Sequence, residues 1–170
     1  MRFSTLHPST MTKASFIEHF KDIYEHSPWM AERAYAHLSS INADDIRHLH
    51  QLMSDVLLNT SKSQQLTLIN AHPDLAGKAA ISRELTASSS SEQAGAGIHE
   101  CSPQEFARFT ELNKMYKTKF NFPFIMAVKG SNRLQILDAF EIRIHNDVET
   151  EFKQAITEIN KIALFRLEAL

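Results

Sequence analysis

The sequence predicts an all-α fold: a single-domain bundle of about seven or eight helices with one short extended apolar segment. Three observations support this fold class. Apolar residues recur at helical spacing along most of the chain, and only four Gly and five Pro interrupt its 170 residues. Hydrophobic residues make up 43% of the sequence, which is enough to bury a core without disulfides. We therefore expect residues 1–170 to form one domain.

The N-terminal part predicts four helices. A first apolar stripe at helical spacing follows Thr12 and comprises Phe16, Ile17, Phe20, Ile23 and Tyr24. A second helix is expected to open at Ser27-Pro28, with the serine as N-cap and the proline in the first helical position. Asn42 is expected to cap a third helix that ends near Asn59, and Ser61 a fourth.

The helical pattern breaks in the middle of the chain. His72–Lys78 contains a proline and a glycine, which predicts a loop or turn between helices. A short polar helix is expected over residues 80–85. Residues 86–97 are rich in Ser, Ala and Gly without apolar periodicity, so taken alone they predict a flexible linker.

The C-terminal part has clearer boundaries. Ser102-Pro103-Gln104-Glu105 is a capping-box sequence, which predicts a helix start, and that helix runs towards Phe120. Phe122–Val128 is apolar, contains a proline and is too short for a typical helix, so we expect an extended buried segment. A long helix is expected over residues 132–144. Asp147 should cap the last helix.

Composition excludes several classes of protein. Eighteen basic and twenty acidic residues nearly balance, whereas nucleic-acid binding favours a basic excess. The N-terminal residues lack the apolar run of a signal peptide, and no stretch approaches the roughly 20 apolar residues of a membrane helix. The last three residues are not a peroxisomal signal. We expect a cytoplasmic protein in which Cys101, the single cysteine, is an inert thiol.

Familiar catalytic motifs are missing. The sequence contains neither GxGxxG nor GxxxxGK[ST], and Ser88–Ser91 lacks the glycines of a nucleophile elbow. Among nine histidines, His48 and His50 are two residues apart, so a helix would point them in different directions. We therefore expect solvent-facing histidines and no metal site.

Three features remain as functional candidates, and each has a simpler structural explanation. His72 precedes Pro73, although a histidine in a turn is more often a satisfied polar residue than a catalyst. Ser89–Gln93 is a polar run that could equally be a solvated linker. Phe124–Val128 is a non-helical buried backbone whose amides need partners, as in an ordinary core strand.

Taken together and in order, these segments resemble the 2-oxo-4-hydroxy-4-carboxy-5-ureidoimidazoline (OHCU) decarboxylase family. The resemblance spans nearly the whole chain. Its most specific parts are the His72-Pro73-Asp74-Leu75-Ala76-Gly77 stretch and Ser89-x-x-Glu92-Gln93. The other matching segments are Tyr24–Trp29, Phe109–Asn113, Tyr116, Phe120, Phe122–Phe124 and the generic pattern Glu158–Leu167.

The resemblance implies a role for each matching position. His72 would be the acid–base histidine, with Pro73 beside the substrate. Glu92 would orient His72, and Gln93 would read the carbonyl and ureido groups. The binding serine would come from Ser89, Ser90 or Ser91, because the serine run leaves the register open.

Two further assignments concern the C-terminal half. The backbone that meets the substrate ring would be that of Phe124, Ile125, Met126, Ala127 and Val128. Arg166 would hold a substrate anion, and Arg143 is the alternative for this role. An arginine suits carboxylate capture because its planar fork bonds bidentately.

The resemblance implies cofactor-independent decarboxylation of OHCU to (S)-allantoin and CO2, by a homodimer that binds a small ureidoimidazoline and neither nucleic acid nor membrane. Two alternatives stay open. One is a non-catalytic helical module that binds a ureide or a protein partner. The other is a hydrolase acting on 5-hydroxyisourate or allantoin. The joint presence of His72, Glu92 and Gln93 favours an active site over a pure scaffold.

Overall fold

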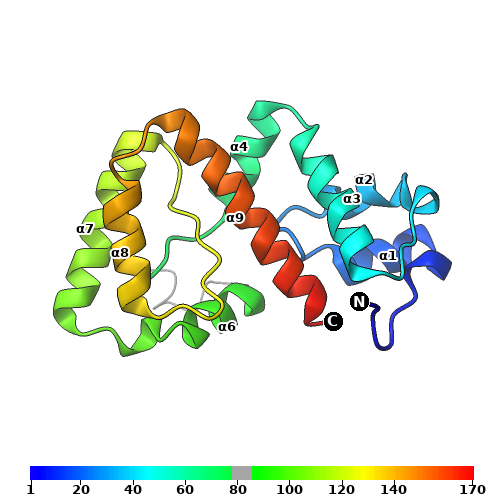
Figure 1. Ribbon diagram of the computed structural model, residues 1–170, viewed down its shortest axis with the longest axis horizontal. Coiled ribbons are helices and arrows are strands. Elements are labelled where there is room, and N and C mark those ends of the chain that lie inside the picture. Colours follow the sequence, from blue (N-terminus) through cyan, green and yellow to red (C-terminus); the bar gives the residue numbers. More distant parts are fainter. Residues whose placement is uncertain (78–85) are drawn as a thin grey trace. The chain divides into compact units, whose positions relative to one another are not determined.

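The computed structural model describes residues 1–77 and 86–170, and these residues form an all-α fold (Figure 1). The chain divides into two compact units, Met1–Ala71 with Asn160–Leu170 and His72–Ile159. The predicted all-α class is confirmed. The single domain expected for residues 1–170 stays a prediction.

The first unit is built from four N-terminal helices and the end of the last one. These are α1 (Lys13–Phe20), α2 (Trp29–Tyr35), α3 (Ile46–Leu58), α4 (Lys62–Ala71) and the C-terminal part of α9 (Val148–Glu168), with the 3₁₀ helices η1 (Pro8–Thr10) and η2 (Leu38–Ser40). The Thr12 side chain caps α1. Ser61 accepts from the Gln64 amide at the start of α4, as predicted. Fully buried apolar side chains, including Phe16, Leu49 and Met53, form its core.

The second unit contains α6 (Ala87–Gly95), η3 (Ile98–Glu100), α7 (Pro103–Phe120), α8 (Arg133–Arg143) and the N-terminal part of α9. Figure 1 shows α7 and α8 side by side, with the chain running back from the end of α7 to the start of α8. Its core is aromatic: Phe124 stacks on Phe140 with ring centroids 3.7 Å apart, and Tyr116 meets Phe124 edge-on at 5.3 Å.

Several C-terminal predictions are confirmed. Ser102 and Glu105 form both bonds of the capping box at the start of α7. Asp147 accepts from the Thr150 amide at the start of α9, at 2.9 Å. Phe122–Val128 is non-helical, and most of its residues are buried. Caps near helix ends are local, which is why the sequence is sufficient to find them.

Two N-terminal helix boundaries differ from expectation. The helix α1 ends at Phe20, so Ile23 and Tyr24 lie beyond it, although both are buried. The Ser27 side chain makes no capping bond to α2, which has Pro28 at its cap position. His26 has a left-handed φ of 45°, so the chain turns sharply before this proline instead of entering the helix through the serine.

The cap of α3 is Asp45 and not Asn42. The Asp45 carboxylate accepts from the amides of Arg47 and His48, at 2.9 and 3.3 Å. A carboxylate is a stronger acceptor than a neutral amide and also suits the positive end of the helix dipole.

The flexible linker expected over residues 86–97 is wrong: most of it forms α6, capped by the Thr86 side chain. Ser89, Gln93 and Ala96 are buried at spacings of four and three residues, so the helix does bury one face. Two of these residues are polar and are satisfied by hydrogen bonds, so apolar periodicity could not reveal the helix. The short helix expected over residues 80–85 lies outside the described residues.

Within the described parts of the chain, no helix combines the length and apolar character that crossing a membrane requires.

Candidate functional site

The candidate site starts from the sharp turn His72–Gly77, which follows α4. The Gly77 amide donates to the Asp74 carbonyl at 3.3 Å, and Ala76 has a left-handed φ of 51°. A Cβ atom at Gly77 would lie 2.7 Å from Asp74 Cβ, closer than such atoms can approach. The turn therefore requires glycine at this position, and alanine at 76 carries backbone strain.

Side chains from two helices hold this turn. Gln93 of α6 accepts from the Ala76 amide at 3.1 Å through Oε1 and donates Nε2 to the Asp74 carbonyl at 3.4 Å. Asn113 of α7 donates to the Leu75 carbonyl at 2.8 Å. The Ala76 amide and the Leu75 carbonyl would otherwise lack a regular partner, and the Asp74 carbonyl gains a second donor beside the Gly77 amide, so the two amide side chains fix the path of the turn.

Further polar atoms of α7 surround the same turn. Lys117 Nζ lies 2.6 Å from Asp74 Oδ2, at a partly exposed position. The Asn113 side chain is buried, and its Oδ1 has no hydrogen-bond partner among the described residues. The turn is thus anchored chiefly by α6 and α7.

The predicted site residues on α6 differ in burial, and Ser89 and Gln93, four residues apart, share the buried side of the helix. Ser89 and Gln93 are buried, Glu92 is partly exposed, and Ser90 and Ser91 are exposed. This burial favours Ser89 as the inward-facing serine of the run. Gln93 bonds the turn with one N–H and one lone pair, which leaves each of its amide atoms capacity for a second bond.

His72 itself is buried, with 8% of its surface exposed, and Pro73 is half-buried. Gln93 links the turn that contains His72 to the helix that contains Glu92. The structure thus brings the two most specific parts of the sequence pattern into one compact unit.

The extended segment Phe124–Val128 lies in the same unit and is held at two of its peptide groups. The Ile125 carbonyl accepts from Arg143 Nη1 at 2.8 Å. The Ala127 amide, one of those expected to face the substrate, donates to Glu158 Oε2 at 2.8 Å. Met126, between them, is partly exposed.

Arg143 belongs to a buried polar network. Its Nη2 lies 2.8 Å from Glu151 Oε2, and the Glu151 side chain is fully buried. The Tyr116 hydroxyl and the Asn146 side chain also donate to this carboxylate. Burial is the main cause of the raised pKa of Tyr116, and the adjacent Glu151 raises this pKa further. The phenol therefore stays protonated and donates its hydrogen bond.

Arg166 lies in the other compact unit, where it pairs with Glu25. The Arg166 Nη2 atom is 2.9 Å from Glu25 Oε2, and the two side chains are 7% and 0% exposed. Nη1 also donates to the Asp22 carbonyl at 3.2 Å. Both arginines considered for anion binding are thus members of buried ion pairs.

Sequence reasoning missed the partners that hold these residues. Asn113, Tyr116 and Glu158 stood in segments of the family pattern but received no role, and Glu25 did likewise. A polar residue in the apolar stripe of a helix is the signal that could have marked Asn113. Glu151 carried no such mark, because an acidic residue in the first turn of a helix is usually a solvated one.

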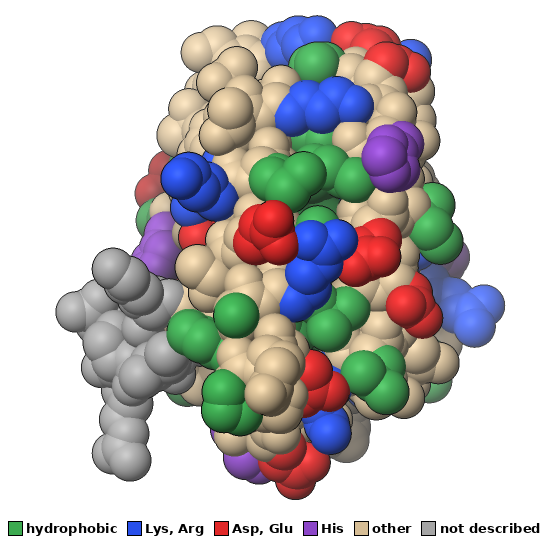
Figure 2. Space-filling view, turned by 90° about the vertical axis from the view of Figure 1, so that its left-hand side faces the viewer, with side chains coloured by type: hydrophobic (Ala, Val, Ile, Leu, Met, Phe, Trp, Pro, Cys, Tyr) green, Lys and Arg blue, Asp and Glu red, His purple; other side chains and the backbone are tan. Residues whose placement is uncertain are grey.

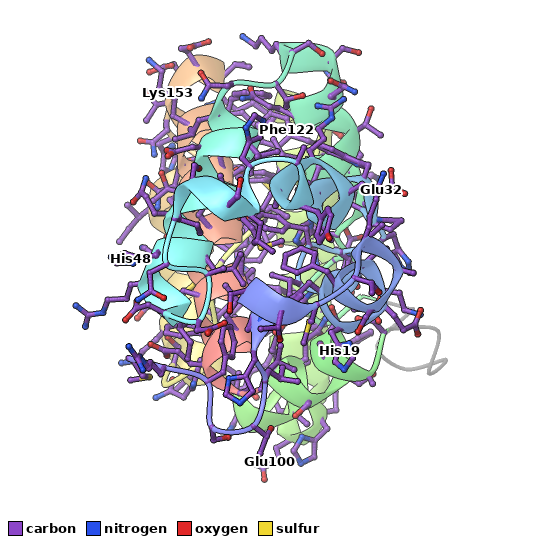
Figure 3. All side chains as sticks on the ribbon, turned by 90° about the vertical axis from the view of Figure 1, so that its right-hand side faces the viewer. His19, Glu32, His48, Glu100, Phe122 and Lys153 are labelled. Carbon is purple, nitrogen blue, oxygen red and sulfur yellow. The ribbon has the colours of Figure 1, made fainter. Side chains whose placement is uncertain are left out.

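Among the described residues, neither the remaining histidines nor Cys101 indicate a metal site or a reactive thiol. Figure 3 labels His19 and His48, both exposed, whereas His50 on α3 hydrogen-bonds the Asn160 carbonyl at 2.8 Å. Among the residues that the structure describes, no three His, Cys, Asp or Glu side chains lie close enough to hold a metal ion. Burial raises the pKa of the Cys101 thiol, which disfavours the reactive thiolate.

Comparison with known proteins gives a consistent result. The sequence model of the family described as OHCU decarboxylase matches residues 9–168. A 2-oxo-4-hydroxy-4-carboxy-5-ureidoimidazoline decarboxylase of Haloferax volcanii is 39% identical over 153 residues, which cover 90% of this chain and 87% of that protein. The uric acid degradation bifunctional protein of Bacillus subtilis is 40% identical, over 85% of this chain but only 28% of its own length.

Two solved structures are also similar. A crystal structure of (S)-allantoin synthase superposes with a TM-score of 0.77 at 30% identity, covering 95% of this chain and 51% of the other. An OHCU decarboxylase crystallised in the presence of (S)-allantoin has a TM-score of 0.68 at 24% identity, covering 88% and 94%. The second likeness concerns the fold alone.

Proposed function

Because the chain belongs to the OHCU decarboxylase family, we propose that it converts OHCU into (S)-allantoin and carbon dioxide in urate degradation, without a metal or organic cofactor. The observation that carries this proposal is the link between two motif segments. Gln93 hydrogen-bonds the turn that begins at His72, which supports a shared site for His72 and the inward face of α6.

The chemistry needs little from the protein because the substrate contains its own electron sink. Carbon 4 of the ring carries both a hydroxyl and a carboxylate, and the neighbouring carbon 5 belongs to an imine. When the bond to the carboxylate breaks, its electron pair forms a double bond between carbons 4 and 5, and the imine nitrogen gains a proton. Loss of the hydroxyl proton and protonation of carbon 5 then give allantoin. The protein supplies orientation, proton transfer and the choice of face.

His72 is the proposed acid–base group. An imidazole titrates near neutrality, so it can take the 4-hydroxyl proton and return a proton to the product. Its buried position favours a defined orientation relative to one ring face, which a single enantiomer requires. Glu92 is proposed to orient the imidazole and to raise its basicity.

The remaining proposed groups bind the substrate. Polar atoms for the ureido and carbonyl groups come from Gln93 and from one serine, which is Ser89 with Ser90 and Ser91 as the alternatives. Pro73 lies beside the substrate. Peptide groups of Phe124–Val128 meet the ring. Arg166 is proposed to hold the substrate anion, supported by its deep burial and planar fork.

The test is direct. OHCU is generated from urate with urate oxidase and hydroxyisourate hydrolase, and its absorbance and the circular dichroism of allantoin are followed. The wild-type protein should speed the loss of OHCU and yield one enantiomer, whereas spontaneous decay yields a racemate. A non-catalytic module would change neither signal, and a hydrolase of the neighbouring steps would leave OHCU decay unchanged.

His72→Ala should lower turnover by at least about 10²-fold, because a positioned acid–base group contributes about that much. The far-ultraviolet helical spectrum should stay the same. A wild-type rate in this variant would remove His72 from the mechanism.

Arg166→Lys should mainly raise KM, because an ammonium cannot reproduce a bidentate bond to a carboxylate. Since Arg166 also pairs with buried Glu25, the thermal midpoint is the companion measurement. A lower midpoint with an unchanged KM would make Arg166 a structural residue.

We also propose that the protein is a homodimer, as its family resemblance implies, and that it is cytoplasmic, as its composition led us to expect. Light scattering coupled to size-exclusion chromatography measures the mass directly, and a monomer at micromolar concentration would contradict the dimer.

A further inference from the structure

Arg143 directs each of its guanidinium nitrogens at another group of the protein. Nε and Nη2 point at Glu151, with Nε 3.1 Å and Nη2 2.8 Å from Oε2. Nη1 donates to the Ile125 carbonyl at 2.8 Å. All three guanidinium nitrogens are therefore engaged by the protein itself, in a geometry that only a planar fork can satisfy.

The groups around Glu151 hold this geometry firmly. The Glu151 carboxylate is fully buried and accepts from Arg143, the Tyr116 hydroxyl and Asn146, the last at 2.7 Å. A buried carboxylate with several donors tolerates little movement of any of them, because each lost bond leaves charge unsatisfied.

Aromatic rings hold the guanidinium as well. It lies over the Phe124 ring, 4.3 Å from its centroid, and Phe140 stacks on the same ring at 3.7 Å. Two groups this close to one centroid occupy opposite faces, so Phe124 is clamped between them. Phe124 is the first residue of the segment proposed to meet the substrate.

Two hydrogen bonds set the backbone direction of that segment. In an extended chain the peptide groups of residues two apart point to the same side, and those of the residue between them point to the other. Arg143 binds the Ile125 carbonyl and Glu158 binds the Ala127 amide, so both groups point towards α8 and α9. The N–H and C=O of Met126 then point to the opposite side.

We infer that Arg143 is a positioning residue of the substrate segment and not the ligand of the substrate anion. Together with Glu151, Tyr116 and Glu158, it fixes Phe124–Val128 so that the Met126 peptide groups face the substrate. This inference rests on the proposed function for the identity of the substrate.

The main test compares Arg143→Lys with Arg108→Lys. Lysine keeps the charge beside Glu151 but cannot also hold the Ile125 carbonyl in the same fork. We expect KM for OHCU to rise about 10-fold, as for one oriented hydrogen bond, with kcat within about 3-fold. Hydrogen exchange should accelerate at the amides of residues 122–130 and stay unchanged in the His72–Gly77 turn.

Arg108 of α7 is a matched control. Figure 2 shows basic and acidic side chains next to one another on the face that α7 and α8 contribute. The Arg108 side chain is 41% exposed and bonds Glu111 and Glu141. Arg108→Lys should leave both KM and the exchange of residues 122–130 unchanged.

The two measurements separate the alternatives. A raised KM without faster exchange would mean that Arg143 touches the substrate, and faster exchange without a raised KM would mean that the segment does not bind it. Either result, or no change in both, overturns the inference. If Arg143→Lys does not fold, Tyr116→Phe keeps the ring and the ion pair, and smaller changes in the same direction are expected.

Failure of the proposed function has a different signature. A wild-type protein without decarboxylase activity would contradict that function, whereas the exchange of residues 122–130 needs no substrate. In that case the affinity for (S)-allantoin, measured by calorimetry, replaces KM. An Arg143→Lys variant with faster exchange and wild-type affinity would still overturn the positioning role.

Discussion

The turn His72–Gly77 and the segment Phe124–Val128 are both irregular backbone in one unit, but they are stabilised in opposite ways. The turn is strained, with a left-handed Ala76 and a glycine that no other residue can replace without a clash. Neutral amide side chains hold it. The segment has no residue with positive φ and relies on charged side chains of α8 and α9.

The difference shows where each shape is encoded. A strained turn needs particular residues within itself, so Pro73 and Gly77 mark it in the sequence. An unstrained segment accepts many sequences and takes its shape from distant partners. Loss of one charge should therefore harm the segment more than loss of one amide harms the turn.

The largest effect is expected from Arg143→Met, which leaves the fully buried Glu151 without its cation. Removing one partner of a buried pair typically costs about 3–5 kcal/mol of unfolding free energy. Urea unfolding measures it, with Arg108→Met as the exposed control. A loss below about 1 kcal/mol would show that the segment does not depend on this charge.

Gln93→Leu should cost less, about 1–3 kcal/mol, because it leaves the Ala76 amide unsatisfied and removes one of two donors to the Asp74 carbonyl but leaves no charge unpaired. The same unfolding experiment applies, together with kcat/KM, which should fall as the turn loosens. Gln104→Leu, at an exposed position of α7, should stay within about 0.5 kcal/mol of wild type. Equal losses for Gln93→Leu and Arg143→Met would erase the contrast between the two segments.

Gly77→Ala and Gly95→Ala should change stability in opposite directions. A Cβ at Gly77 meets Asp74 Cβ at 2.7 Å, so the turn must shift, at a cost of about 1–3 kcal/mol. A Cβ at Gly95, at the end of α6, meets nothing within 4 Å, and alanine there should stabilise by up to about 1 kcal/mol. Thermal unfolding distinguishes the signs, and a neutral Gly77→Ala would contradict the strained turn.

Lys117→Met should have the smallest effect, because its ion pair with Asp74 is partly exposed, at 46% and 26%. Such pairs contribute about 0–1 kcal/mol, and the difference from wild type should vanish near 1 M salt. A larger, salt-independent loss would mean that charge matters at the turn as it does at the segment.

Sequence reasoning recovered what is local. The caps Ser61, Ser102 and Asp147 act within a few residues, and each was predicted. The helix α6 was missed because its buried face is largely polar. The buried Gln93 on that face is stabilised by its hydrogen bonds to the His72–Gly77 turn. The network around Glu151 was missed because its partner Tyr116 lies 35 residues away in the sequence. The residues next to either one do not indicate that the two side chains pair.

The helix α7 contacts both irregular segments from adjacent turns. Asn113 and Lys117 bind the turn, and Tyr116, between them in sequence, joins the network of the segment. One extra residue inserted between positions 113 and 116 would rotate Asn113 by about 100° relative to Tyr116 and Lys117, so the turn and the segment could not both keep all their contacts with α7. The number of residues in this stretch of α7 is therefore fixed, although its solvent-facing residues can be substituted.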